Sequence, residues 1–409
     1  MSRWQLAVAS PLTPAMLWAG LRRAGGDRVS TDALRAQLQR ETGMGGAVLV
    51  DSGTSALRLA LEAAHARRPG LPVAMPAYGC FDLATAARGA GVPVRLYDLD
   101  PFTLQPEAGV IDRWMREGLA ALVVVHLFGI AAAPSWWRAS AARHGVPVIE
   151  DAAQGAGLHV DGRPAGGHGD LAVLSFGRGK GRTGGGGGAL LYRDPAQWSL
   201  PGAPEAGSRA ENGRVWAMTV AQWLLGRPSL YALANAVPGA ALGETVEKAP
   251  ASVRAMAPSS IAMVLAGSEA AHAAARHRRA MAGRWIADLP PDTVIARDAA
   301  GQGGALRLPV LLPDRASRDG FVQQWRRFGV AAGYPTALID LPSLQSAIVR
   351  AADASAPGAR ALADRVALLP THGFVTEADR RPVAAALRAV ASRSHVASGP
   401  VATAEAARG

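Results

Sequence analysis

The chain has 409 residues, 49% of them apolar, which is enough to bury one large domain and one smaller domain. Its single cysteine, Cys80, excludes a disulfide framework within the chain and the paired spacing of zinc fingers, and it favours a cytoplasmic location. The formal charge of +11 is compatible with acidic small molecules, but the basic residues form no run and no nucleic-acid-binding motif is present. The N-terminal segment up to Arg23 makes a poor signal peptide, and no apolar run reaches the roughly 20 residues of a membrane-spanning helix.

Short apolar runs alternate with helical patterns between about residues 45 and 195. Runs rich in valine and leucine without clean alternation are typical of strands buried on both faces, and their separation by helices predicts right-handed crossovers. We therefore predict a three-layer α/β large domain over residues 1–283. Its mostly parallel sheet of about seven strands is drawn from 47–52, 72–78, 93–100, 121–129, 146–151, 171–177 and 187–194.

Residues 200–250 differ in character from the strand-rich part of the chain. Between Val215 and Gly243 the only charge is Arg227, and Pro228 splits the segment into two apolar helical pieces. We expect a helical insertion that packs on the body of the protein or on a dimer partner. The alternative is a surface at 215–243 that meets a membrane as a peripheral contact or meets an acyl-bearing substrate.

The rest of the chain predicts a second, smaller domain. Residues 257–285 have the pattern of one long helix that leads out of the large domain. Strand-like and helical segments then alternate over residues 284–390, which indicates a small α+β domain. The polar, alanine-rich stretch 391–409 is expected to be a disordered tail.

One lysine, Lys180, lies among glycines directly after the run 171–177, in the stretch LSFGRGKGRTGGGGGALLY. A phosphate-binding P-loop would need serine or threonine after the lysine and a glycine five residues before it, but Gly181 and Ser175 stand there. The other use of a desolvated lysine is a Schiff base with a carbonyl cofactor, and glycines would let a planar cofactor approach the backbone. Pyridoxal 5'-phosphate would also need an acid for its pyridine nitrogen and a cradle for its phosphate.

The sequence supplies a candidate for each of these two needs. Asp151 ends the run VPVIED, where its carboxylate could face the pyridine nitrogen; the alternative is an N-cap of a helix over AAQGA. Ser52 to Ser55 precede a helix, so that free N–H groups and the hydroxyls of Thr54 and Ser55 could bind a phosphate; the alternative is an ordinary helix cap. Ser175 could add a further hydroxyl.

The order of these motifs resembles the DegT/StrS sugar aminotransferase family of fold-type I pyridoxal-phosphate enzymes. The resemblance runs from about residue 30 to 390. It is carried by DSGTSAL, MPAYGC, AGVPVRLYDLDP, VVHLFG, VPVIEDAAQGAG, GRPAGGHGD, LSFGRGK with GGAL behind it, YPT and LLPTHGFVTEAD.

The resemblance assigns roles to several residues. It implies that Lys180 forms the Schiff base, that Asp151 pairs with the pyridinium, and that Gln154 contacts the ring. Thr54, Ser55 and Ser175 fall where the family holds the cofactor phosphate.

The chain also departs from the family pattern. Where the family offers an aromatic residue to stack on the cofactor ring, the register through MPAYGCFD places Cys80, with Tyr78 and Phe81 nearby; Cys80 is equally compatible with a small buried residue. Gly186 replaces the usual glutamate before the paired glycines. The asparagine motif that reaches the partner subunit's phosphate is not evident near SVRAMAPSS.

Three further residues are candidates for the substrate side of the site. His126, in VVHLFG, matches a family position at a strand end, and a structural histidine is the alternative reading. Tyr334, in AAGYPT, and His372 come from the small domain, and for both the alternative is loop packing.

The resemblance implies an aminotransferase that acts as a homodimer with a shared active site. The amino donor would be glutamate or glutamine, and the acceptor most often a keto group on a nucleotide-linked sugar. Relatives that dehydrate their substrate carry histidine at the lysine position, so Lys180 argues against that branch. An aminotransferase of an unusual natural-product or acyl-linked ketone stays open, as does a non-catalytic binding protein, although the latter should have lost Lys180 or Asp151.

Overall fold

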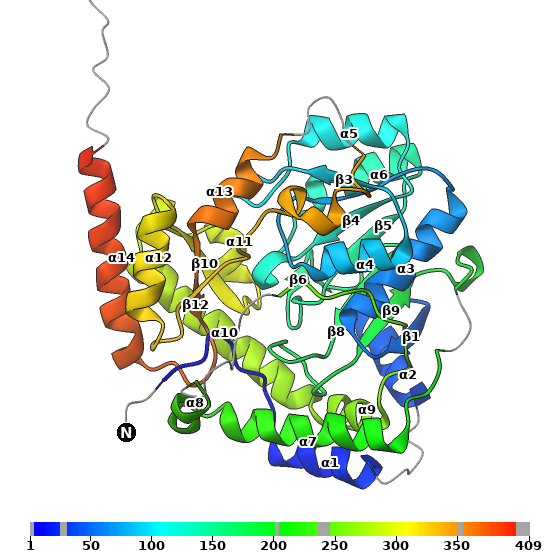
Figure 1. Cartoon of the computed structure of the whole chain (residues 1–409), viewed down its shortest axis with the longest axis horizontal. Helices are drawn as coiled ribbons and strands as arrows, with labels where there is room; N and C mark the ends of the chain where they lie inside the picture. The colour runs from blue at the N-terminus through cyan, green and yellow to red at the C-terminus, as the bar shows by residue number, and fades with distance from the viewer. Residues whose placement is uncertain (1–3, 25–30, 201–203, 236–245, 350–354, 398–409) are drawn as a thin grey trace, which may run out of the picture.

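The computed structural model describes residues 4–24, 31–200, 204–235, 246–349 and 355–397 (Figure 1). A seven-stranded sheet forms the centre of the larger part, and only β9 runs antiparallel to its neighbours. The expected α/β fold with a mostly parallel seven-stranded sheet is confirmed. The strands in sheet order are β1 (Gly46–Val50), β9 (Gly188–Tyr192), β8 (Leu171–Ser175), β5 (Val148–Asp151), β4 (Ala121–Val125), β2 (Val73–Pro76) and β3 (Val94–Tyr97).

Helices pack on both faces of this sheet. Along β9, Leu190 belongs to one apolar cluster, while Ala189 and Leu191 belong to another. Because successive side chains of a strand point to opposite faces, the two clusters lie on opposite sides of the sheet. The first cluster receives side chains from α3 (Gly53–Arg67), α4 (Asp82–Ala90), α5 (Ala108–Glu117) and α6 (Arg138–His144), and the second from α2 (Thr31–Thr42) and α9 (Pro258–Ala266).

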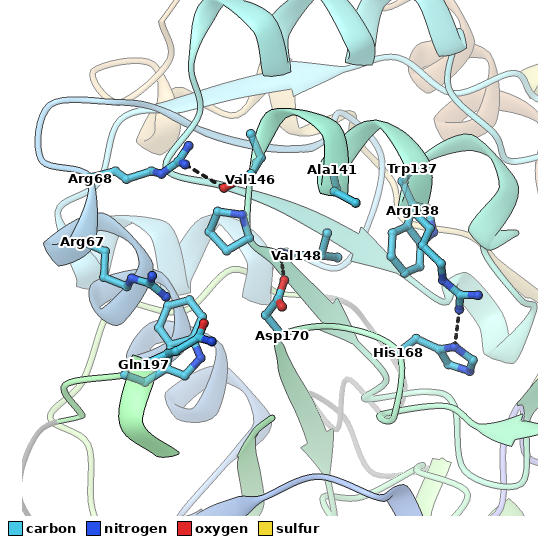
Figure 2. A pocket seen from close by; sticks show the side chains of 14 residues that line it. Arg67, Arg68, Trp137, Arg138, Ala141, Val146, Val148, His168, Asp170 and Gln197 are labelled. Carbon is cyan, nitrogen blue, oxygen red and sulfur yellow. Dashed lines mark hydrogen bonds between the residues drawn. The ribbon is translucent and has the colours of Figure 1, made fainter. Parts of the chain in front are cut away.

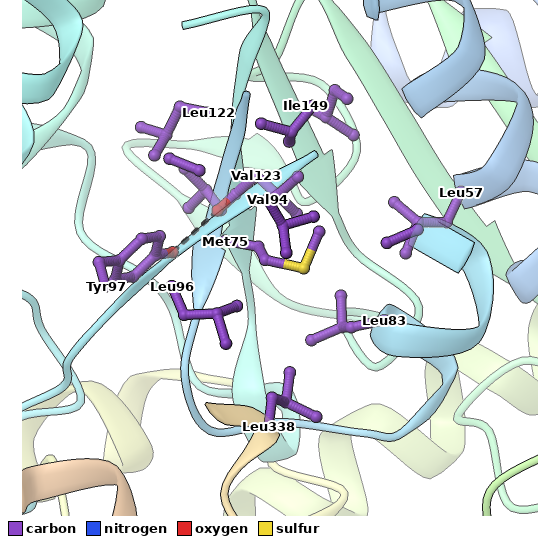
Figure 3. Close-up of a cluster of buried hydrophobic side chains, with 14 of the residues drawn as sticks. Leu57, Met75, Leu83, Val94, Leu96, Tyr97, Leu122, Val123, Ile149 and Leu338 are labelled. Carbon is purple, nitrogen blue, oxygen red and sulfur yellow. Dashed lines mark hydrogen bonds between the residues drawn. The ribbon is translucent and has the colours of Figure 1, made fainter. Parts of the chain in front are cut away.

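The first cluster also contains side chains from the C-terminal part of the chain. Figure 3 shows Met75, Leu83 and Leu338 in one group of buried side chains, although Leu338 lies far along the sequence. Each such leucine or methionine contributes about 1.5–3 kcal/mol to stability through its removal from water. The hydroxyl of Tyr97 donates a hydrogen bond to the Val123 carbonyl at 2.8 Å, so the one polar atom of that buried ring is satisfied.

A second, antiparallel sheet of three strands belongs to the C-terminal part. Its order is β10 (Arg307–Leu311), β12 (Val366–Pro370), β11 (Ala331–Ala332). Buried Trp285 lies in the core of this part and donates from Nε1 to the Pro370 carbonyl at 3.0 Å. The helices of this part are α10 (Ser268–Asp288), α11 (Arg297–Gln302), α12 (Arg315–Trp325), α13 (Pro357–Arg365) and α14 (Glu377–Ala397).

Two expectations about helices need correction. The single helix expected over 257–285 is broken at Gly267 into α9 and α10, where a Cβ would lie 2.6 Å from the Met16 side chain of α1 (Pro14–Ala24). The tail expected from residue 391 begins as helix, because α14 continues to Ala397; residues 398–409 lie outside the described residues.

The apolar segment after residue 200 forms the two expected helical pieces. α7 (Arg209–Leu225) begins with a capping box made by Ser208 and Glu211, and α8 (Pro228–Asn235) begins at the proline. The remainder of the segment, 236–245, lies outside the described residues. α7 packs against α1 and α9 along one edge of the molecule (Figure 1). None of the helices in the described ranges has the length and apolar character needed to span a membrane.

Candidate active site

The residues singled out by the sequence meet at the carboxyl edge of the large sheet. Asp151 is the last residue of β5 and Ser175 the last residue of its parallel neighbour β8. Lys180 follows in a tight turn, in which its N–H donates to the Gly177 carbonyl at 3.3 Å. Ligand sites of open α/β sheets form at this edge, beyond the ends of the strands.

Asp151 lies beside the charge of Lys180. Burial raises the pKa of the Asp151 carboxyl, while the Ala153 N–H bond and then the charge of Lys180 act to lower it. The Oδ1 atom accepts the N–H of Ala153 at 2.9 Å, and the other oxygen makes no hydrogen bond within the described part of the chain. Residues 152–157 form turns, so the alternative of a helix capped by Asp151 is wrong. One carboxylate oxygen is therefore left for a ligand.

The first turn of α3 and the end of β8 form a cradle for an anion. Ser52 caps the helix by accepting the Ser55 N–H at 3.1 Å, which leaves the N–H groups of Gly53 and Thr54 without a helical acceptor. A Cβ on Gly53 would lie 2.7 Å from the Ser175 Cβ. Glycine at this position therefore lets the Ser175 hydroxyl lie against the positive end of the helix.

A chain of hydrogen bonds joins the two parts of the molecule next to this cradle. Gln154 Nε2 donates to the Tyr334 hydroxyl at 2.9 Å, and the Tyr334 backbone N–H donates to the Tyr78 hydroxyl at 3.1 Å. Burial raises the pKa of both tyrosines, which keeps them protonated. The Oε1 atom of Gln154 is buried and accepts no hydrogen bond from the described residues. That oxygen is free to accept a hydrogen bond from a ligand.

Aromatic rings surround this chain. The ring of Phe128 stacks on Tyr334 with 5.8 Å between centroids and 16° between planes. Phe128 has a φ of +59°, an unfavourable value for a non-glycine residue that often marks a functional site. Apart from the HLFG motif, no pattern in the sequence indicates that Phe128 stacks on Tyr334 or has a positive φ.

Cys80 stands at the position where an aromatic residue was expected. Burial, followed by the charge of Asp82, raises the pKa of its thiol to about 12, so the sulfur is not a thiolate at neutral pH. The thiol donates to Asp82 Oδ2 at 3.4 Å. Its place is thus that of a small, half-buried residue near Tyr334.

Two of the three candidate substrate-side residues have their ring nitrogens occupied by the protein. His126 accepts the Ala132 N–H at Nδ1, 3.1 Å away, and therefore donates from Nε2 to Glu150 at 2.9 Å. His372 lies 2.8 Å from the Leu6 carbonyl through Nε2. Of the three, only Tyr334 lies in the aromatic group beside Gln154.

Arg307 is a further candidate that sequence reasoning missed. It is half-buried at the start of β10, and its Nε is buried without a hydrogen-bond partner among the described residues. Its positive charge acts to lower the pKa of Tyr78 and Tyr334. A lone arginine in a strand of another sheet carries no motif that could have revealed it.

The glycines after Lys180 have a different function from the one expected. A Cβ at Gly185 would overlap the Thr219 hydroxyl of α7, and one at Gly187 would lie 2.6 Å from Met256. Both glycines also have positive φ, at +78° and +98°. The run therefore lets the loop turn sharply beneath α7 and the segment before α9, rather than making room for a ligand.

The seven-stranded sheet with helices on both faces is the fold of the fold-type I pyridoxal-phosphate enzymes. Residues 23–211 match the model of the DegT/DnrJ/EryC1/StrS aminotransferase family, which confirms the resemblance seen in the sequence. Over that part of the chain, the sequence is similar to that of this family.

Individual relatives agree with this match. A segment of 143 residues is 38% identical to L-glutamine:2-deoxy-scyllo-inosose aminotransferase from Streptoalloteichus tenebrarius and covers 34% of this chain and 33% of the relative. Another of 144 residues is 33% identical to UDP-N-acetyl-3-dehydro-alpha-D-glucosamine 3-aminotransferase from Acidithiobacillus ferrooxidans, over 35% of this chain and 39% of the relative. The chain thus spans about a third of the length of the curated relatives it matches.

The solved structures extend the likeness of fold over the whole chain. The aminotransferase TlmJ from Streptoalloteichus hindustanus superimposes with a TM-score of 0.69 at 23% identity, over 96% of this chain and 100% of the other. At this level of identity the similarity is one of fold.

The site fits pyridoxal 5'-phosphate, the cofactor of this class. The cofactor has a phosphate, a pyridine nitrogen and a ring hydroxyl, each of which needs a polar partner. The α3 cradle, the free oxygen of Asp151 and the unsatisfied Oε1 of Gln154 offer these partners at one edge of the sheet. Lys180, in the turn after β8, supplies the amine.

Proposed function

We propose that this chain is an aminotransferase that uses pyridoxal 5'-phosphate. It would move an amino group from glutamate or glutamine to a keto group on a sugar or a related ring, in most cases a nucleotide-linked one. The proposal is supported by one observation: Asp151, the turn with Lys180 and the start of α3 all lie at the carboxyl edge of the large sheet.

The chain's own residues would hold the cofactor at three points. Gly53, Thr54 and Ser175 would bind its phosphate, with Ser55 in the same turn. Asp151 would accept a hydrogen bond from the pyridine nitrogen, and Gln154 would accept one from the ring hydroxyl. When bound, the cofactor supplies an aldehyde that takes up the amino group and a ring that withdraws electrons from the reacting carbon.

Lys180 has two tasks in this scheme. Its Nζ would hold the aldehyde of the cofactor. The same nitrogen would move the proton removed from the α carbon of the donor. The negative charge of Asp151 would favour a protonated pyridine nitrogen and so assist the removal of that proton. Tyr334, Phe128 and Tyr78 exclude water from one side of the site.

The acceptor is assigned from the relatives' chemistry. Their names specify amination of an inosose, which is a ketone on a six-membered polyol ring, and of a nucleotide-linked keto sugar. A hydroxylated ring ketone is the substrate feature that these names share. Amination of an acyl-linked ketone is a second candidate, because α1 and α7 expose Trp18, Leu21, Met218, Leu224 and Leu225.

The same exposed apolar face supports a homodimer. This face is defined by the exposed side chains of Trp18 and Leu21 of α1 and of Met218, Leu224 and Leu225 of α7, and α1 and α7 lie side by side (Figure 1). We propose that a second copy covers it, with the active site shared between subunits. A cytoplasmic location is proposed with it, in keeping with a half-buried free cysteine and metabolite substrates.

The test begins with an absorption spectrum of the purified protein before and after borohydride. A band near the visible edge that disappears on reduction, with the added mass on the peptide that contains Lys180, is expected. Lys180→Ala should lose the band and the turnover and keep the melting temperature. Turnover by Lys180→Ala, or a protein that takes up no cofactor when it is supplied, would remove the proposal. Matched incubations with L-glutamine and a keto-inositol or a nucleotide-linked keto sugar then identify the acceptor.

A further inference from the structure

A cavity lies at the opposite edge of the large sheet, away from Lys180. Its volume is about 300 Å³, and it lies between the end of α3, the start of α6 and the loops that flank β5, β8 and β9 (Figure 2). Val148, the first residue of β5, forms part of its floor, whereas Asp151 ends that strand at the active-site edge. The cavity is therefore separate from the site described above.

The cavity is lined by arginines. Arg67 is exposed, and its guanidinium makes no hydrogen bond or ion pair within the described part of the chain. It lies over the ring of Trp198, with 4.6 Å from its Cζ to the ring centroid, which holds the guanidinium in place. Arg68 has a structural role, because its guanidinium donates to the carbonyls of Leu119 and Gly145 at 3.0 and 2.7 Å.

A second oriented arginine faces Arg67 from the other side of the cavity (Figure 2). Arg138 lies over the ring of Trp137 at 5.6 Å and donates from Nη2 to His168 Nδ1 at 2.8 Å. Since an arginine can only donate, the hydrogen of that histidine is on Nε2. Burial lowers the pKa of His168, so the histidine is neutral and adds no charge. Arg138 also lies 3.6 Å from the exposed Asp161.

Asp170 is the single carboxylate in the lining. Its Oδ2 accepts the Val148 N–H at 2.8 Å, and it lies between the two oriented arginines (Figure 2). Three guanidiniums against one carboxylate leave the lining positive. The rest of the lining is apolar or aromatic apart from Gln197 and His168, and Trp137, which is 3% exposed, has a buried Nε1–H without an acceptor among the described residues. The cavity thus offers cations, a carboxylate acceptor and aromatic faces.

We propose that this cavity binds a small organic phosphate that carries hydroxyl groups, such as a sugar phosphate. Arg67, whose guanidinium has no partner among the described residues, binds the phosphate oxygens by charge-assisted hydrogen bonds. Arg138, on the opposite side of the cavity, donates to hydroxyl groups of the ligand. Asp170 accepts a hydrogen bond from a ligand hydroxyl, and Trp198 packs against the carbon skeleton. Ligand pockets span about 300–1,000 Å³, so a cavity at the lower limit suits a single phosphorylated ring better than a nucleotide-linked sugar.

The test uses the cofactor-loaded protein, freed of excess cofactor by gel filtration, so that the phosphate cradle at α3 is already filled. Isothermal titration in a phosphate-free buffer compares three probes: a hexose 6-phosphate, the unphosphorylated hexose and inorganic phosphate. We expect the hexose phosphate to bind most tightly. Arg67→Gln and Arg138→Gln should each weaken it by about 10- to 100-fold, because each removes a charge-assisted hydrogen bond. Arg40→Gln, on an exposed face of α2, is the matched control and should leave binding unchanged.

Three results would overturn the assignment. The first is the absence of hexose phosphate binding at millimolar concentration, and the second is binding that both arginine variants retain. Equal affinity for inorganic phosphate and hexose phosphate would show an ion site without a place for the organic part. All three substitutions are at exposed side chains, and equal melting temperatures establish that the variants are folded.

Discussion

At the scale of single residues, the site combines a buried acid with a nearby amine. Burial raises the pKa of Asp151, so its charged form is unfavourable unless a cation lies opposite it. The protein offers Lys180 near the carboxylate and leaves one of its oxygens without a hydrogen bond. A protonated ring nitrogen at that oxygen would stabilise the charge, so the cofactor and Asp151 each favour the charged form of the other.

This coupling predicts the effect of Asp151→Asn. The amide keeps the shape of the side chain but cannot hold the ring nitrogen protonated. We expect cofactor content to stay near that of the native protein and the rate of proton removal from the donor to fall by about 100-fold or more. Stopped-flow absorption with saturating L-glutamine measures this rate. Asp161→Asn, at an exposed carboxylate, is the control, and an unchanged rate in Asp151→Asn would contradict the assigned role.

Arg307 predicts a second effect at this scale. A half-buried guanidinium whose Nε lacks a partner among the described residues, and whose charge acts to lower the pKa of Tyr78 and Tyr334, is suited to bind a carboxylate of the donor or an anionic group of the acceptor. We expect Arg307→Met to raise the KM of one of the two substrates by about 10- to 100-fold, with a smaller change in kcat. Arg315→Met, on an exposed turn of α12, is the matched control. Steady-state kinetics with each substrate varied in turn measures the two KM values. Two unchanged KM values would exclude Arg307 from the site.

The positions of Lys180 and Asp151 at the edge of the sheet could be predicted from the sequence, because both lie at the ends of apolar runs that have the pattern of parallel strands. The carboxyl ends of such strands meet at one edge, so linear order alone brings their side chains together. Arg307 and Phe128 could not be found in this way. Arg307 lies in another sheet, and the left-handed backbone of Phe128 is a property of the folded loop.

At the scale of elements, the loop after Lys180 is held by segments that come from elsewhere in the chain. The hydroxyl of Ser10 accepts hydrogen bonds from the Gly179 N–H and from Gln222 of α7, both at 2.9 Å. Thr219, one turn earlier on α7, lies against Gly185. The helical insertion therefore has a structural task next to the lysine turn, which its apolar sequence did not reveal.

This packing predicts that Gly185→Ala destabilises the protein. The new methyl group would overlap Thr219, and alanine disfavours the φ of +78°. We expect a loss of about 2–4 kcal/mol in the free energy of unfolding, seen as a lower melting temperature. Gly213→Ala is a control on α7 itself, because a Cβ there meets nothing within 4 Å. It should stabilise the helix by about 0.5–1 kcal/mol. Equal stability of the two variants would contradict the close packing.

At the scale of the whole molecule, the small part adds Tyr334 to a candidate site whose lysine, aspartate and anion cradle lie in the large part. Leu338 donates its N–H to the Ala77 carbonyl at 2.7 Å, which seats the small-part loop that carries Tyr334 on the large sheet. The N-terminal segment crosses between them, since Gln5 donates to the Phe374 carbonyl at 2.7 Å and Ser10 binds the lysine turn. The sequence predicted two parts, but these contacts join residues hundreds of positions apart and leave no local pattern.

Glu150 also connects several parts of the fold. Its buried carboxylate accepts hydrogen bonds from His126 and from the N–H groups of Gly166, His168 and Gly169, and so ties β4 and β5 to the loop before β8. Burial alone would raise the pKa of Glu150. The bonds from His126 and the loop outweigh it and lower that pKa to about 2.

The lowered pKa predicts how stability depends on pH. A carboxyl group whose pKa is lower in the folded state contributes fully above its unfolded pKa, near 4.5, and loses that contribution as the pH falls toward 2. The contribution of Glu150 is about 3 kcal/mol at neutral pH. Urea unfolding of the native chain and Glu150→Gln at several pH values measures it. We expect a stability difference that is largest at pH 7 and shrinks below pH 4, because protonation then makes the native carboxyl resemble the amide. A difference that stays constant down to pH 3 would show that Glu150 acts through packing and not through its charge.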